Sequence, residues 1–92
     1  MDLGINGKTA IVTGGSQGIG RAIARGLAAE GARVVICARG MQELQEAASE
    51  IASETKTPVF PVQADVTRPE TITQLVAKTL DGFGSVDILV NN

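Results

Sequence analysis

The 92-residue sequence contains no histidine and no tyrosine, and it has a single cysteine, Cys37. Histidine and tyrosine are two of the side chains that most often move protons in active sites, so two common general acid–base groups are missing from the whole chain. One cysteine cannot form an intramolecular disulfide. Cys37 lies between Ile36 and Ala38 in an apolar run, so we expect an inert core residue. No metal site is predicted.

The net charge is also small. The formal net charge is -2 and no basic run is present, so nothing predicts binding to nucleic acid or to an anionic membrane. No apolar stretch approaches the roughly 20 residues that span a bilayer. The start, "MDLGINGK", has neither the cationic front nor the apolar run of a signal peptide. We therefore expect a cytoplasmic protein without a membrane partner.

Strand-like and helix-like segments alternate along the chain. Short β-branched apolar runs predict buried strands, and apolar residues three and four positions apart predict helices, such as one with Ile19, Ile23 and Leu27 that Gly31 closes. Pro61 lacks a donor and favours an edge position for the third strand. "TRPE" fits a capping box, in which Thr67 accepts from the first turn and Glu70 reaches back. The predicted strands are 9–13, 33–38, 58–64 and 86–90. The predicted helices run from 18 to the closing Gly31, from 41 to about 53, and from the capping box at 67–70 to near Gly82 and Gly84.

Alternating strands and helices predict right-handed crossovers and a parallel sheet that is covered on both faces. A hydrophobic fraction of 43% is enough for one core, and 92 residues allow one domain. The expected architecture is the first half of a doubly wound α/β domain.

The glycine-rich segment "TGGSQGIG", Thr13 to Gly20, stands where the first strand passes into the first helix. A helix start leaves N–H groups without partners and carries partial positive charge, so a phosphate fits there. Gly14 would shape the turn, Gly18 would admit a pyrophosphate, and Gly20 would let helix and strand pack closely. The alternative is a helix-start turn that is merely rich in glycine. The position inside the first βαβ unit favours the phosphate interpretation.

Two other glycine motifs do not fit. A P-loop needs G-x-x-x-x-G-K-[ST], but Arg21 stands in place of the lysine and Ala22 in place of the metal-binding hydroxyl. The common dinucleotide motif G-x-G-x-x-G has a different spacing from Gly14, Gly18 and Gly20.

The spacing T-G-x-x-x-G-[IL]-G resembles the short-chain dehydrogenase/reductase family, and the resemblance extends over essentially all 92 residues. "GKTAIVTGGSQGIGRAIA" is similar to the family's opening strand, turn and helix, "ADV" (64–66) to the motif after its third strand, and "DILVNN" (87–92) to the start of its N-N-A-G motif. Within the family, the sequence most resembles 3-oxoacyl-carrier-protein reductases and related sugar or alcohol dehydrogenases. The resemblance implies a Rossmann-type sheet of order 3-2-1-4 and these cofactor-binding residues: Gly14, Ser16, Gln17, Gly18, Ile19, Gly20, Arg39, Asp65, Val66 and Asn91.

The end of the second strand selects the cofactor. A carboxylate there accepts from the ribose 2′-hydroxyl of NAD, whereas an arginine binds the 2′-phosphate of NADP. Ala38 occupies the acid's place and Arg39 follows, so NADP is favoured over NAD, with Ser16 as a second donor to the 2′-phosphate. Alternatively Arg39 is a solvated residue at a helix start. Asp65 either contacts the adenine or caps the third helix, and Asn91 closes the fourth strand and borders the adenosine.

The resemblance implies hydride transfer between the nicotinamide and a small carbonyl or alcohol substrate, in an enzyme that assembles as a homo-oligomer when complete. The family's tyrosine, lysine and serine lie beyond the fourth strand, so no catalytic residue is expected in residues 1–92, a partial NAD(P)-binding domain truncated before the catalytic half. Its open fourth strand would make the isolated chain marginal, dimeric or prone to aggregation. The alternative is a non-catalytic nucleotide-binding or subunit-pairing module from a truncated gene.

Overall fold

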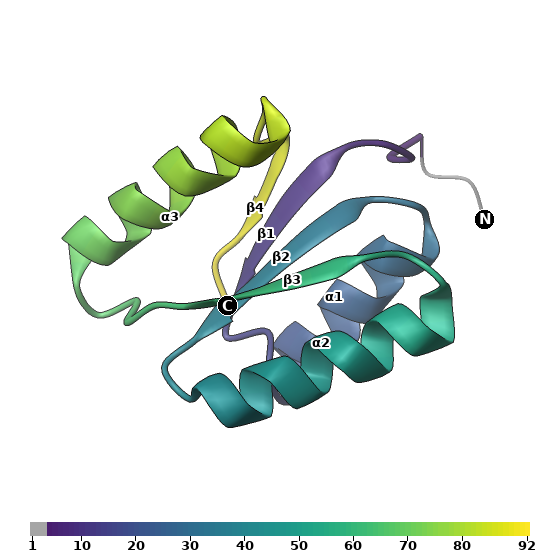
Figure 1. The fold of residues 1–92 in the computed structure, drawn as a ribbon, viewed down its shortest axis with the longest axis horizontal. Coiled ribbons are helices and arrows are strands. Elements are labelled where there is room, and N and C mark those ends of the chain that lie inside the picture. Colours follow the sequence, from purple (N-terminus) through teal and green to yellow (C-terminus); the bar gives the residue numbers. More distant parts are fainter. Residues whose placement is uncertain (1–3) are drawn as a thin grey trace.

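The structure is a computed structural model and describes residues 4–92. Strands and helices alternate strictly along this part of the chain (Figure 1). The elements are β1 (Thr9–Thr13), α1 (Gly18–Ala29), β2 (Arg33–Ala38), α2 (Met41–Thr55), β3 (Val59–Gln63), α3 (Pro69–Phe83) and β4 (Ile88–Val90). The predicted order of elements is confirmed, and no helix within residues 4–92 has both the length and the apolar composition that crossing a bilayer takes.

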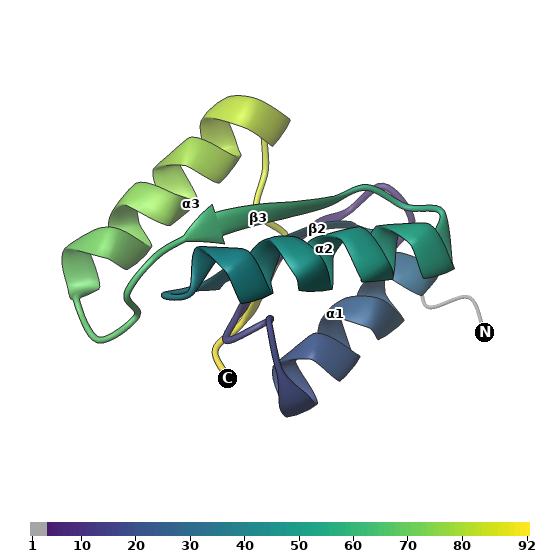
Figure 2. The same ribbon diagram turned by 60° about the horizontal axis from the view of Figure 1, so that its bottom comes forward.

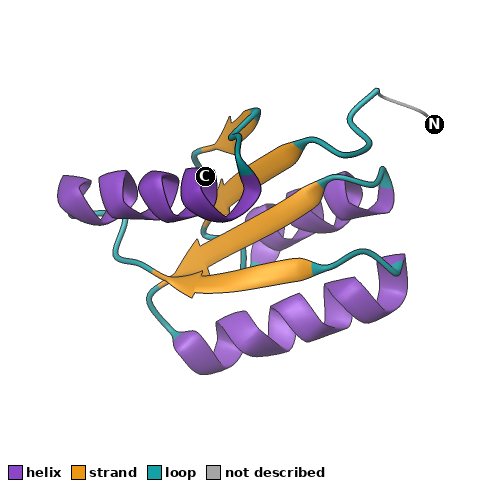
Figure 3. Ribbon diagram, turned by 45° about the horizontal axis from the view of Figure 1, so that its top comes forward, coloured by secondary structure: helices purple, strands orange, loops and turns teal. Residues whose placement is uncertain are grey.

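The four strands form one parallel sheet in the order β3-β2-β1-β4, as the resemblance implied (Figure 3). β1 is central, with Thr13 opposite Cys37 of β2 and Val12 opposite Val90 of β4. Because the strands are parallel, the turns that follow them all leave from one edge of the sheet. β3 is an edge strand, which agrees with the position predicted from Pro61.

The sheet has α1 and α2 on one side and α3 on the other (Figure 2). An apolar cluster of buried residues lies on each side of it. Val12, Val34 and Ile36 point toward α1 and α2 and are fully buried with Leu44 and Ile51 of α2. Ile11, Val35 and Cys37 point to the opposite face and pack with Leu75 of α3. Successive residues of a strand face opposite sides. Both sides are covered here, so β1 and β2 are continuous apolar runs.

The inner face of α1 consists of small residues. Gly20, Ala24 and Ala28 are buried, whereas Ile23 and Leu27 are half-buried and Ile19 is 72% exposed. Small side chains let the helix approach the sheet closely, and the larger residues of the predicted spacing lie along its flank. Gly31 follows the helix with φ +88°, and its N–H donates to the Ala28 carbonyl at 2.9 Å, as predicted for a left-handed closing residue.

The capping box predicted for the third helix is wrong. α3 begins at Pro69, its N-cap residue is Arg68, and no side chain caps it. Thr67 instead donates its hydroxyl to Asp65 Oδ1 at 2.6 Å, and Glu70 accepts from Arg68 Nε at 2.9 Å. Thr67 bonds to Asp65 instead of to the first turn of the helix, because Asp65 lies only two residues before it and an Asx turn closes with little loss of chain entropy.

The amino-terminal edge of the sheet has its own polar contact. Thr9 N–H donates to Asp87 Oδ2 at 2.9 Å, and Asp87 N–H donates to the Thr9 carbonyl at 2.9 Å. The first of these bonds, together with the Ser85 hydroxyl and the nearby Lys8 and Arg33, lowers the pKa of Asp87 below its ordinary value. This pair of bonds fixes β4 beside β1 at the point where both strands begin.

Candidate functional site

The glycine turn is anchored to the neighbouring strand. Gly14 N–H and Gly15 N–H both donate to the Cys37 carbonyl, at 2.8 and 3.3 Å. Gly14 has φ +67°, a left-handed conformation that glycine adopts without a Cβ penalty. The chain therefore turns sharply at the end of β1. Burial raises the pKa of the Cys37 thiol, partly offset by a hydrogen bond from Gly14, and Cys37 lies in the core as predicted.

Two glycines of the turn permit backbone contacts that a side chain would prevent. A Cβ on Gly20 would lie 2.2 Å from the Gly14 carbonyl oxygen, and one on Gly15 would lie 2.7 Å from Ile36 Cβ. The contact at Gly20 is the close packing that the sequence predicts. The role of Gly15 is missed by the sequence reasoning, although the Gly14–Gly15 doublet directly after a strand is a signal for it.

The start of α1 is open to solvent. Arg21 N–H donates to the Gln17 carbonyl at 3.2 Å, so the N–H groups before Arg21 lack acceptors within the helix, and no side chain caps them. Gly18 has φ +57° and nothing within 4 Å of its Cβ position. Ser16 is half-buried, and Gln17 is exposed. This is a surface of free backbone donors with the helix dipole behind it, which suits an anion.

β4 joins the turn through Thr13 and the two asparagines. The buried Thr13 hydroxyl lies 3.2 Å from the Val90 carbonyl and 3.3 Å from Asn91 Oδ1, and it accepts from Asn92 N–H at 2.9 Å. The Nδ2 atom of Asn92 lies 3.2 Å from the Cβ position of Gly14. Asn91 does close the fourth strand, but Asn92, which was not predicted, is the residue that packs on the glycine turn.

A pocket of about 220 Å³ opens beside the turn, between the ends of β2 and β3. It brings together four of the predicted site residues, Gly14, Arg39, Asp65 and Val66. Its other lining residues are Ala38, Ala64 and Thr67. Ser16, Gln17, Gly18, Ile19, Gly20 and Asn91 lie outside this lining, on the turn and at the end of β4. The two groups of residues meet at Gly14.

Asp65 is held by its own turn and faces a positive neighbour. Its Oδ1 accepts from the Thr67 hydroxyl at 2.6 Å and from Thr67 N–H at 3.0 Å. These bonds, with the positive charges of Arg39 and Arg68, lower the pKa of Asp65. The carboxylate is therefore ionised at neutral pH, and its negative charge attracts the positive charge of Arg39. Asp65 caps the turn before α3, not the helix itself.

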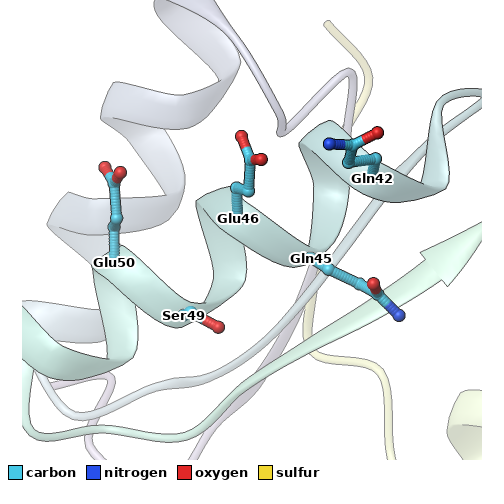
Figure 4. A pocket seen from close by; sticks show the side chains of 5 residues that line it. All are labelled: Gln42, Gln45, Glu46, Ser49 and Glu50. Carbon is cyan, nitrogen blue, oxygen red and sulfur yellow. The ribbon is translucent and has the colours of Figure 1, made fainter.

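A second hollow, of about 430 Å³, lies on the polar side of α2 (Figure 4). Gln42, Gln45, Glu46, Ser49 and Glu50 line it, all from one helix. Glu50 forms an ion pair with Arg21 of α1, and Glu54 forms another with Arg25 at 2.9 Å. The acidic residues here join the two helices and make this face unsuited to a phosphate.

A family model described as short chain dehydrogenase matches residues 8–92. The chain belongs to this family of oxidoreductases. Peroxisomal 2,4-dienoyl-CoA reductase from Danio rerio is 41% identical over 88 residues, which are 96% of this chain and 29% of the relative. The family that the sequence motifs indicated is thus confirmed.

Solved structures agree in fold and in sequence. L-Sorbose reductase from Gluconobacter frateurii, complexed with NADPH and L-sorbose, has a TM-score of 0.93 and 47% identity, over 100% of this chain and 35% of that one. A metagenomic short-chain oxidoreductase in complex with NADP has a TM-score of 0.90 and 38% identity, over 96% and 39%. The chain spans less than half the length of these relatives.

Proposed function

We propose that this chain forms the NADP(H)-binding part of a short-chain oxidoreductase. In the whole protein, hydride passes between the nicotinamide and a carbonyl or alcohol carbon of a small substrate. The observation that carries the proposal is the position of Arg39 on the pocket that also contains Gly14 and Asp65. This pocket suits the adenosine end of the cofactor, and the adjoining helix start suits its diphosphate.

The charge at the end of β2 supports NADP over NAD. Ala38 stands where a ribose-binding acid is expected, and the next side chain, Arg39, is exposed at the rim of the pocket. A guanidinium pairs with the two oxygens of a 2′-phosphate, whereas a carboxylate would repel them. The related structures of L-sorbose reductase and the metagenomic oxidoreductase contain NADPH and NADP.

The glycine turn would hold the diphosphate through the backbone. The start of α1 has no side-chain cap, and nothing lies within 4 Å of the Cβ position of Gly18, which leaves room for phosphate oxygens at the free N–H groups. Ser16, which is half-buried in the same turn, keeps the role of a second donor to the 2′-phosphate. When bound, the cofactor supplies the hydride, and the residues of this chain bind and orient it.

The family resemblance implies that a tyrosine transfers the proton that accompanies the hydride. No tyrosine or histidine occurs in the 92 residues. We place the proton donor, the substrate pocket and the contacts of a homo-oligomer in the remainder of a longer protein. The same absence favours a second candidate, a non-catalytic module that binds nucleotide, or pairs with another subunit, without turnover.

The substitution Arg39→Asp tests the cofactor assignment. We expect the affinity for NADPH to fall about tenfold or more while that for NADH is kept or rises, because a charge-assisted bond is replaced by repulsion. Lys56→Asp makes the same change in net charge and serves as the control, because Lys56 is the exposed C-cap residue of α2, at the opposite end of that helix from Arg39. An unchanged ratio of the two dissociation constants in Arg39→Asp would refute the role of Arg39.

The two candidates differ in turnover. The assay mixes the longest natural form of the protein with NADPH and a panel of aldehydes and ketones, and follows the absorbance at 340 nm. Loss of NADPH with any of these substrates supports the oxidoreductase. Tight NADPH binding with no turnover of any substrate supports the module.

A further inference from the structure

Two hydrogen bonds connect β3 and the residue after it to the turn between β2 and α2, which contains Arg39. Ala38 pairs with Gln63 at the last rung of the ladder between β2 and β3. Past that rung, Ala64 N–H donates to the Ala38 carbonyl at 3.0 Å, and Gln63 Nε2 donates to the Arg39 carbonyl at 2.7 Å. The side chain of Gln63 thus continues the sheet by one peptide group after the strands have ended.

The Arg39 peptide group has little other support. Arg39 lies after the end of β2, and α2 begins at Met41, after the extended N-cap residue Gly40 (φ -87°, ψ 105°). No side chain caps α2. Backbone rotation at Arg39 and Gly40 would swing the base of the arginine side chain relative to the pocket. The bond from Gln63 opposes this rotation, because a carbonyl held at 2.7 Å fixes the plane of its peptide group.

We propose that Gln63 is a positioning residue for recognition of the cofactor's 2′-phosphate. It does not line the pocket, and it acts through the backbone of Arg39. The proposal rests on the NADP-binding role of Arg39 argued above. It adds that the selectivity for a 2′-phosphate depends on a side chain of the third strand as well as on the arginine that ends the second.

The probes are 2′,5′-ADP and 5′-AMP, which differ only in the 2′-phosphate and avoid any contribution from the nicotinamide. Gln63→Met keeps the length of the side chain and removes the donor. We expect the affinity for 2′,5′-ADP to fall roughly two- to tenfold, as for one lost hydrogen bond, with 5′-AMP affinity unchanged. Gln45→Met on α2 is the matched control, which should change neither affinity. Calorimetric titration measures both.

The ratio of the two affinities separates positioning from a loss of structure. If Gln63→Met weakens both probes equally, or neither, the role of Gln63 is refuted. If the parent chain itself shows no preference for 2′,5′-ADP, the NADP assignment fails and this inference fails with it. If the parent chain prefers 2′,5′-ADP over 5′-AMP, and Arg39→Ala removes this preference while Gln63→Met retains it, only the role of Gln63 is refuted. Should Gln63→Met not fold, Gln63→Asn, whose shorter amide stops before the Arg39 carbonyl, undergoes the same ratio test.

Discussion

Substituting Gly20 by alanine tests how the glycine turn is built. A Cβ at this position would lie 2.2 Å from the Gly14 carbonyl oxygen, 2.9 Å from the Gly14 carbonyl carbon and 2.8 Å from Asn92 Nδ2. Two of these three atoms belong to the backbone, and that backbone is held by the bond from Gly14 N–H to the Cys37 carbonyl. No rotation of a side chain relieves the contact, so α1 must move away from the turn.

The magnitude follows from two opposing effects. Overpacking of a well-packed site costs typically 1–3 kcal/mol, and a backbone clash belongs at about the upper end. Alanine in place of glycine in a helix gains about 1 kcal/mol. The net expectation for Gly20→Ala is a loss of about 2 kcal/mol in the free energy of unfolding, which lowers the melting temperature of a domain of this size by roughly 8–16 °C.

Gly26 provides the matched control in the same helix. It is exposed, and nothing lies within 4 Å of its Cβ position. Gly26→Ala therefore gains the higher helix propensity of alanine without any clash, and it should raise the melting temperature by about 4–8 °C. Thermal unfolding followed by circular dichroism compares the two variants. Equal melting temperatures for Gly20→Ala and Gly26→Ala would refute the proposed contact between α1 and the turn.

Two further substitutions test the polar contacts at the two edges of the sheet. Thr13→Val removes the hydroxyl that accepts from Asn92 N–H and should cost about 1–3 kcal/mol in urea unfolding, whereas Thr13→Ser should cost less; equal losses would contradict the account. Asp87 has a lowered pKa, so its ionised form stabilises the fold above the unfolded value of about 3.9, and this contribution is lost as pH falls through the folded value. Asp87→Asn should be less stable than the parent at pH 7, and the gap in urea midpoint should narrow by pH 3; a constant gap would refute it.

Much of the fold could be predicted because the strands carry a strong signal. β1 and β2 are apolar and β-branched on both faces, so their predicted bounds agree with the structure. β3 is shorter than predicted by one residue at each end, and β4 is shorter by two residues at its start. Pro58 and Asp87 lie at those starts, where the chain makes turn or side-chain contacts before the ladder begins.

Contacts that depend on register could not be predicted. Which of two consecutive asparagines packs on the glycine turn is decided by the pairing of Val12 with Val90, and a shift of one residue would exchange them. The capping box failed for a similar reason. A sequence pattern shows that Thr67 can accept from a helix, but the competing bond to Asp65 is visible only when both partners are placed.

The hydrogen bonds at the carboxyl edge explain how short turns hold a defined site. The turn after β1 is bonded to the Cys37 carbonyl of β2, and the turn after β2 is bonded to Gln63 of β3. The end of β4 is bonded to Thr13 of β1. Each turn is thus fixed by a neighbouring strand of the sheet, so the relative positions of the glycine turn and Arg39 are set by strand register. A site supported in this way keeps its geometry before any ligand arrives, which reduces the ordering cost of binding.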